Sequence, residues 1–140
     1  MKYDFLIEDA FKAMENSYAP YSNYHVGACL LCKDGSKYIG ANVENAAYGS
    51  TMCAERNAIF SAYSHGVRKD DIEAIAIVSD GKTLATPCGS CRQVLSELLN
   101  QDTPVIVSNG KDLLVSCMKE LLPYSFTKKD LDKWKVALSH

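Results

Sequence analysis

The chain has 140 residues, of which 47% are hydrophobic and 23% are charged, and fifteen basic against seventeen acidic residues give a net charge of −2. These values are typical of one globular domain and exclude a disordered or collagen-like chain. No polybasic run is present to hold a nucleic-acid backbone. No apolar stretch approaches the ~20 residues of a membrane span, and the first ten residues lack the apolar core of a signal peptide. We therefore expect a cytoplasmic protein with a single domain over residues 1–140, and neither nucleic acid nor membrane as a partner.

The hydrophobic pattern predicts helices alternating with strands. Leu6, Ala10 and Met14 recur at helical spacing near the N-terminus, and Asp34-Gly35 marks the turn of a hairpin. In chain order we expect a helix over residues 3–18, a loop over 18–25, hairpin strands over 26–32 and 37–44, a helix over 52–64 capped by Ser50 or Thr51, a strand over 73–78, a helix over 87–100, strands over 104–108 and 113–117, and helices over 117–122 and 128–138. This order predicts an α/β fold, a three-layer α-β-α arrangement around a mixed sheet of about five strands.

Six cysteines are the unusual feature of the composition. In a cytosolic chain they indicate metal binding, catalysis or core packing rather than disulfides. Cys88 and Cys91 lie three residues apart at the start of a predicted helix, so their thiols share one side and can bind one metal ion. The helix N-terminus also favours the thiolate form. By itself this Cys-x-x-Cys pair is equally compatible with a redox pair or half of a structural zinc site.

Cys53 opens the other predicted helix. Helices that follow neighbouring strands can direct their N-termini into one crevice, which would bring a third thiolate to Cys88 and Cys91. Three protein ligands with an open fourth position are typical of catalytic zinc. Cys29 and Cys32 instead lie three apart in a predicted strand, so they face opposite sides. We expect these two and Cys117 to be reduced thiols in the core.

Glu55 follows Cys53 by two residues and would point away from it on a regular helix. In a first turn that faces a metal ion, however, a long carboxylate can reach the ion's water without binding the ion. A proton carrier for that water must sit there. Taken alone, Glu55 is better explained as an acid placed favourably at a helix N-terminus. Together with the three cysteines, it indicates catalysis.

These motifs resemble the zinc deaminases that act on cytosine, most closely the small homotetrameric branch of the cytidine and deoxycytidylate deaminase family. The resemblance covers nearly the whole chain. It rests on Cys53-Ala54-Glu55-Arg56, Pro87-Cys88-Gly89-Ser90-Cys91-Arg92-Gln93, Asn42-Val43-Glu44-Asn45-Ala46, Tyr18-Ala19-Pro20-Tyr21-Ser22, and Leu121-Leu122-Pro123 with Phe126. Where that family often has Phe then Pro, this chain has Tyr24 and His25.

The resemblance implies a hydrolytic deaminase that converts cytidine and deoxycytidine to uridine and deoxyuridine and serves pyrimidine salvage. Cys53, Cys88 and Cys91 would bind one Zn²⁺ per subunit. Glu55 would take a proton from the zinc-bound water, whose hydroxide attacks C4 of the cytosine, and deliver it to N3.

Substrate contacts are implied in the same way. Asn42 and Glu44 would bind the ribose hydroxyls, the backbone of Ala54 would contact the base, and Tyr24 would flank it. Tyr48 and Phe126 resemble residues that reach the active site of a neighbouring subunit, which predicts a homotetramer with shared sites.

Three thiolates leave a zinc site with a net charge of −1, so charge must be drawn from the sulfurs. Arg56 resembles the family arginine that donates to the ligand thiolates, and Gln93 is expected to assist it. Without the resemblance, a solvated surface cation is the safer reading of an arginine.

Three alternatives stay open at this point. One is a related enzyme that deaminates a cytosine-containing antibiotic such as blasticidin S. Enzymes of that kind share both zinc motifs. Another is a nucleic-acid deaminase, which the acidic balance of the chain disfavours. The third is a structural zinc module, which would need a fourth protein ligand and no Glu55.

Overall fold

The protein is described here by a computed structural model that places residues 2–131. Its elements alternate between helix and strand. In chain order they are α1 (Asp4–Met14), β1 (Val26–Cys32), β2 (Lys37–Ala41), α2 (Ala54–Ser64), β3 (Ile72–Ser79), α3 (Gly89–Leu98), β4 (Val105–Ser108), β5 (Leu113–Ser116) and α4 (Met118–Leu121), with short 3-10 turns at Tyr48–Ser50 and Lys69–Asp71. None of the helices in this described part is long and apolar enough to cross a membrane.

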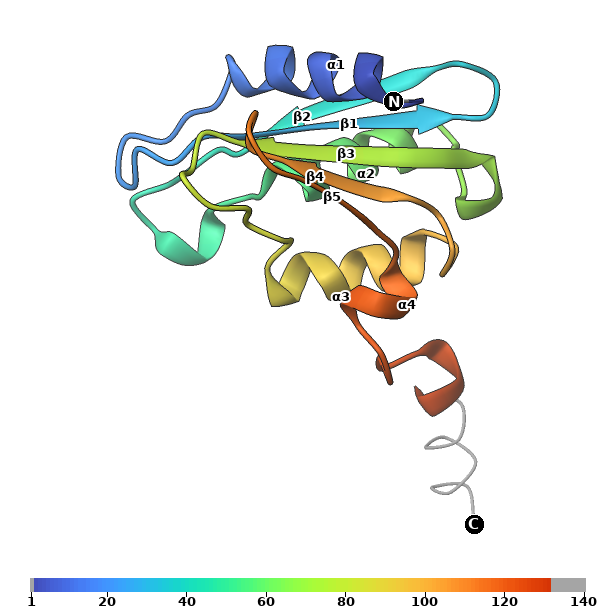
Figure 1. Cartoon of the computed structure of the whole chain (residues 1–140). Helices are drawn as coiled ribbons and strands as arrows, with labels where there is room; N and C mark the ends of the chain where they lie inside the picture. The colour runs from blue at the N-terminus through green and yellow to red at the C-terminus, as the bar shows by residue number, and fades with distance from the viewer. Residues whose placement is uncertain (1, 132–140) are drawn as a thin grey trace.

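The strands form one five-stranded sheet in the order β2-β1-β3-β4-β5 (Figure 1). β1 pairs antiparallel with both β2 and β3. β3 and β4 are parallel, and β5 returns antiparallel at the edge. The parallel pair needs a crossover, and α3 supplies it. The predicted mixed sheet is therefore confirmed.

Helices cover both faces of the sheet, as expected for three layers (Figure 1). On one face α1 buries Leu6 and Ala10 against residues of β1, β3 and β4. On the other face α2 and α3 bury Ile59 and Leu95 against the same strands. Because both faces of the central strands are covered, β3 is apolar along nearly its whole length rather than alternating. This arrangement confirms the predicted α/β fold.

The two cysteines of β1 lie on opposite faces, as their spacing predicts. Cys29 packs in the core beneath α1 and Cys32 in the core beneath α2, and both are buried. The prediction was wrong for Cys117, which is only half-buried and lies at the N-cap of α4, with its thiol 3.6 Å from Glu120 Oε1. The neighbouring Met118 and Leu121 of α4 enter the core instead, while the Cys117 thiol remains partly exposed.

Several predicted elements are longer than the real ones. The first helix ends at Met14 rather than residue 18, since the chain must turn back there to reach the sheet. The second hairpin strand ends at Ala41, which leaves Asn42 and Glu44 outside it. Neither Ser50 nor Thr51 caps α2, because Cys53 holds that position. Most of the predicted helix over residues 128–138 lies outside the described residues.

Candidate active site

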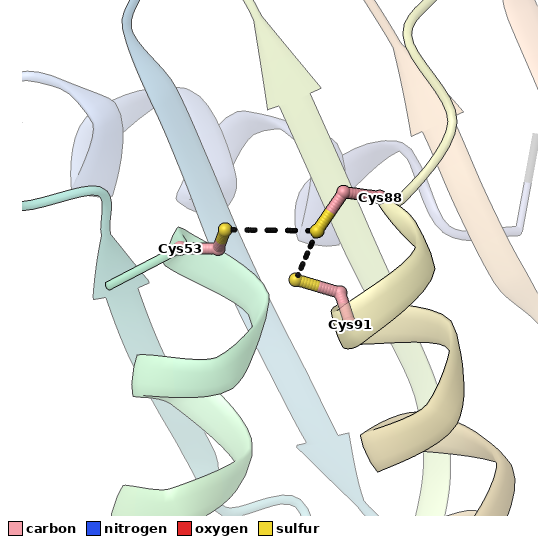
Figure 2. Close-up of side chains that lie close together, drawn as sticks. All are labelled: Cys53, Cys88 and Cys91. Atoms are coloured by element: carbon pink, nitrogen blue, oxygen red, sulfur yellow. Dashed lines mark hydrogen bonds between the residues drawn. The ribbon is translucent and has the colours of Figure 1, made fainter. Parts of the chain in front are cut away.

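Three cysteine side chains meet where α2 and α3 begin (Figure 2). Cys53 is the N-cap of α2, Cys88 is the N-cap of α3, and Cys91 lies in the first turn of α3. The Sγ atoms of Cys53 and Cys88 are 3.9 Å apart, and those of Cys88 and Cys91 are 3.3 Å apart. Neither N-cap side chain caps its own helix, so both thiols are directed to the shared point between the helices.

The spacing of the sulfurs fits a zinc ion. A tetrahedral site with Zn–S bonds of about 2.3 Å places its sulfurs about 3.8 Å apart. All three Sγ atoms lie within 4.8 Å of one another, and in the described part of the chain no histidine or carboxylate belongs to the cluster. Three soft thiolates are a donor set that zinc prefers, and they leave a fourth position for a small oxygen ligand.

The surroundings of the cluster favour negative charge on the sulfur of Cys53. The pKa of Cys53 is lowered by its hydrogen bonding to Cys91 and by the guanidinium of Arg56, whose Nη2 lies 3.3 Å from the Cys53 sulfur. The pKa of Cys91 is raised by the same hydrogen bond to Cys53 and by burial. The N-termini of α2 and α3 add positive potential from two sides. Arg56 thus lies where the sequence resemblance expects it.

Glu55 is an acidic side chain that is almost fully buried, with 5% of its surface exposed. Burial is the main cause that raises its pKa, and the nearby charge of Cys53 raises it further. Cys53 has extended N-cap geometry, so the spacing rule for regular helices does not separate the two residues. Glu55, Cys53 and Cys88 consequently line one cavity.

This cavity has a volume of about 340 Å³, within the range of small-molecule sites. It extends from the cysteines toward the ends of β1 and β2. Beyond the thiols and Glu55 it is lined by residues that the sequence singled out, namely Tyr24, Asn42, Glu44, Tyr48 and Ala54. The structure therefore brings most of the expected site residues together.

Glu44 is held in place by a neighbouring loop. Its Oε1 accepts hydrogen bonds from the backbone N–H groups of Tyr21 and Ser22, at 2.9 and 3.1 Å, and its Oε2 accepts one from the Ser22 hydroxyl. These bonds, the Ser22 hydroxyl first among them, lower the pKa of Glu44. The Ser22 hydroxyl also accepts a hydrogen bond from the N–H of Tyr24 at 3.0 Å.

Ser22 was not among the site residues predicted from the sequence. It belongs to the Tyr18–Ser22 segment of the family resemblance, and that is the one signal that could have indicated it. No spacing rule connects a serine to a glutamate 22 residues away.

Asn42 is also fixed by its own chain. Its Oδ1 accepts hydrogen bonds from the Ser17 hydroxyl and from the N–H of Val26, and its Nδ2 donates to the carbonyl of Tyr24 at 2.9 Å. One N–H of the amide remains for a ligand. The side chain therefore offers a donor beside the acceptor oxygens of Glu44, a pairing that suits a sugar diol.

Tyr24 forms part of the cavity wall, and its buried hydroxyl has no hydrogen-bond partner among the described residues. Its ring lies against Gly81, where an added Cβ would come within 2.9 Å of it. Tyr24 stands where the family often has phenylalanine, and Gly81 on the facing loop leaves room for its ring. The neighbouring His25 bonds Asp80 through Nδ1 at 2.7 Å.

Two predicted site residues lie elsewhere in this chain. Gln93 donates from Nε2 to the carbonyl of Phe126 at 3.0 Å, and it forms no hydrogen bond with a sulfur of the cluster or with Arg56 among the described residues. The reason is helical geometry, since residues two apart such as Cys91 and Gln93 face different directions. Phe126 is 62% exposed and lines a separate hollow beside α3.

The fold and this site together define a zinc-binding α/β protein with three thiolate donors and a buried carboxylate. Comparison with known proteins agrees. Residues 1–108 match the model of the cytidine and deoxycytidylate deaminase zinc-binding region. The chain is 52% identical to a cytidine deaminase of Halalkalibacterium halodurans over 91% of this chain and 96% of that one. It is 47% identical to a cytidine deaminase of Sporosarcina psychrophila over 90% and 92% of the two chains.

A crystal structure of cytidine deaminase from Burkholderia pseudomallei superposes with a TM-score of 0.86, at 45% sequence identity, and the match covers 90% of this chain and 100% of that one. The chain therefore belongs to the cytidine and deoxycytidylate deaminase family.

Proposed function

We propose that this protein deaminates cytidine and deoxycytidine by hydrolysis, for the salvage of pyrimidine nucleosides in the cytoplasm. One water is consumed, the C4–N bond of cytosine is broken, and uridine or deoxyuridine and ammonia are released. The observation that carries this proposal is the cluster of three thiols, two of which, Cys53 and Cys88, line a single cavity together with the buried Glu55. The Asn42 and Glu44 pair lines the same cavity and suits a ribose.

Cys53, Cys88 and Cys91 would hold the metal. A zinc ion bound there supplies Lewis acidity, which lowers the pKa of a coordinated water. Glu55 accepts a proton from the attacking water at its carboxylate and delivers it to N3 of the cytosine ring. Its burial supports this role because a carboxylate with a raised pKa holds a transferred proton more readily than an ordinary one. Arg56 and the two helix N-termini offset the negative charge of the thiolates.

The remaining contacts orient the nucleoside. The free N–H of Asn42 donates to a ribose oxygen, and a carboxylate oxygen of Glu44 accepts from a ribose hydroxyl. The ring of Tyr24 flanks the base, and the backbone of Ala54, in the first turn of α2, contacts its polar edge. Tyr48 borders the same cavity, where it would close over the substrate.

The direct test measures the loss of cytidine absorbance together with the zinc content of the same sample. We expect turnover of cytidine and deoxycytidine, with one zinc per chain. Blasticidin S is the discriminating third substrate. Rapid turnover of blasticidin S with little turnover of either nucleoside would assign the protein to the antibiotic deaminases instead.

Replacing Ser22 with alanine tests the ribose contacts. The variant loses the hydrogen bond that most lowers the pKa of Glu44, so that pKa rises toward its ordinary value. Glu44 then becomes protonated at a higher pH, and ribose binding is lost sooner on acidification. We expect KM to rise about 10-fold with kcat nearly unchanged, since one to two hydrogen bonds are affected. The acid limb of the kcat/KM profile should move to higher pH.

Ser36→Ala is the matched control, because that hydroxyl bonds Asp34 on a hairpin turn outside the cavity. An unchanged acid limb in Ser22→Ala would contradict the proposed link between Ser22 and Glu44.

We further propose a homotetramer in which Phe126 of one subunit completes the site of another. The exposed ring of Phe126 lies outside the cavity of its own chain, which supports such sharing, whereas Tyr48 lines the cavity of its own chain. Light scattering should give a mass near four chains.

Phe126→Ala should raise KM about 10-fold or more, since a buried aromatic contact is worth more than 1 kcal/mol. A fully active monomer would contradict the proposal.

A further inference from the structure

One arginine holds the loop that leads into Cys88. This loop runs from the end of β3 to the start of α3. The guanidinium of Arg92 donates from Nε to the carbonyl of Pro87 at 2.7 Å and from Nη2 to the Thr86 hydroxyl at 2.5 Å. Its third donor, Nη1, reaches the carbonyl of Leu121 at 2.8 Å. The planar fork of one side chain thus ties the two residues before Cys88 to the end of α4.

Besides the packing of Leu84 against the core and the burial of Pro87, the loop has few other hydrogen-bond restraints. Among the described residues, those at positions 81–87 form no backbone–backbone hydrogen bond. Asn109 holds its start, donating to the carbonyls of Gly81 and Lys82 at 3.2 Å each. Arg92 therefore provides the hydrogen bonds at the end of the loop that carries a thiol.

We propose that Arg92 is a positioning residue for the metal site, which sets the place of Cys88 by fixing Pro87 and Thr86. This proposal rests on the proposed role of Cys88 as a zinc ligand. Cys88 is exposed and precedes the first residue of α3, so the helix holds it only through its carbonyl, which accepts the N–H of Arg92 at 2.9 Å. The hydrogen bonds of Arg92 fix the backbone immediately before Cys88. The Cys88 thiol therefore lies beside Cys53 and Cys91 before any metal binds, and the loop need not become ordered on binding.

The hydrogen bond from Arg92 to Leu121 also connects the metal-site loop to the segment after α4. α3 also holds the segment after α4 through Gln93, which bonds the Phe126 carbonyl, and through Ser96, whose hydroxyl lies 3.0 Å from that of Ser125. Arg92 bonds Leu121 at the start of the same segment. One helix therefore joins the loop of the metal site to the segment that bears Phe126, so loosening either end is expected to loosen the other.

The test compares zinc retention in Arg92→Lys and Arg92→Ala with the wild type. Each protein is loaded with zinc and challenged with a chromogenic chelator. We expect zinc to leave both variants at least 10-fold faster, because supporting hydrogen bonds of this kind contribute 10- to 100-fold to metal affinity. Lysine keeps the positive charge but cannot make three bonds in a fixed plane. A loss in both variants would show that geometry rather than charge is at work.

Arg68→Lys and Arg68→Ala are matched controls. Arg68 also bonds backbone carbonyls, those of Tyr63 and Val67 at 3.2 and 2.8 Å, but it lies beyond the far end of α2. We expect zinc release at the wild-type rate from both.

Hydrogen exchange over residues 81–88 and 121–126 gives a readout that is independent of metal, and both segments should exchange faster in the Arg92 variants. If Arg92→Ala does not fold, Arg92→Lys and Arg92→Gln carry the comparison.

The outcomes separate this inference from the proposed function. Zinc release at the wild-type rate from Arg92→Lys, with unchanged exchange in both segments, would overturn the positioning role while leaving the ligand set intact. Full zinc retention by a Cys88→Ala variant would overturn the ligand set itself, and with it the basis for the role of Arg92.

Discussion

Replacing Glu55 with glutamine is expected to lower kcat by about 10³-fold or more while zinc remains bound, since positioned acid–base groups contribute 10² to 10⁴. Glutamine preserves the shape of the side chain but can neither accept nor deliver a proton. It also places no charge at a site that is 5% exposed, so the fold should be retained. The measurements are steady-state kinetics with cytidine, zinc content by elemental analysis, and the melting temperature.

The control for this variant is Glu97→Gln, an exposed glutamate on α3 outside the cavity, which should keep wild-type turnover. Turnover by Glu55→Gln within a few-fold of the wild type would contradict the proton-carrier role. Loss of zinc from Glu55→Gln would instead assign Glu55 to the metal's own ligands.

Replacing Cys88 with alanine is expected to reduce bound zinc from one per chain to nearly none after dialysis, and to abolish turnover. Structural zinc sites with four ligands bind with 10 to 16 kcal/mol, so losing one thiolate costs roughly 3 kcal/mol, or about 10²-fold in affinity. The two sulfurs that remain, on Cys53 and Cys91, cannot enclose the ion. Zinc content and kinetics measured on one preparation check both effects.

Cys117→Ala is the matched control, because this half-buried thiol lies at the start of α4 and outside the sulfur cluster. It should retain both zinc and activity. If Cys88→Ala and Cys117→Ala lose the same amount of zinc, the assignment of the three ligands is wrong.

The pattern of apolar residues was sufficient to predict the fold class. The alternation of helical and strand periods placed every strand of the sheet within a few residues, because burial on one or both faces imposes those periods directly. Strand alternation also placed Cys29 and Cys32 on opposite faces. Boundaries were less accurate. The first helix stops at Met14 and the second hairpin strand at Ala41, where packing against the sheet rather than local preference ends them.

The motifs likewise indicated the residues of the site but not how they are held. Cys53, Cys88 and Cys91 could be selected from their places at predicted helix starts, and Glu55 only in combination with them. Gln93 bonds the Phe126 carbonyl instead of the sulfur cluster, because side chains two residues apart on a helix, such as Cys91 and Gln93, face different directions.

The sequence by itself determined the class of fold, the three thiols and the carboxylate, because short-range periodicity and spacing encode them. Only the tertiary structure decided which distant groups support that chemistry. Ser22 orders Glu44 across 22 residues, and Arg92 bonds Leu121 across 29. Such bonds depend on where two remote loops come to lie once the sheet has formed, and no local pattern in the chain records that position. The three thiols of the metal site come from one chain. The exposed Phe126 is the residue that we expect to complete the site of a second subunit.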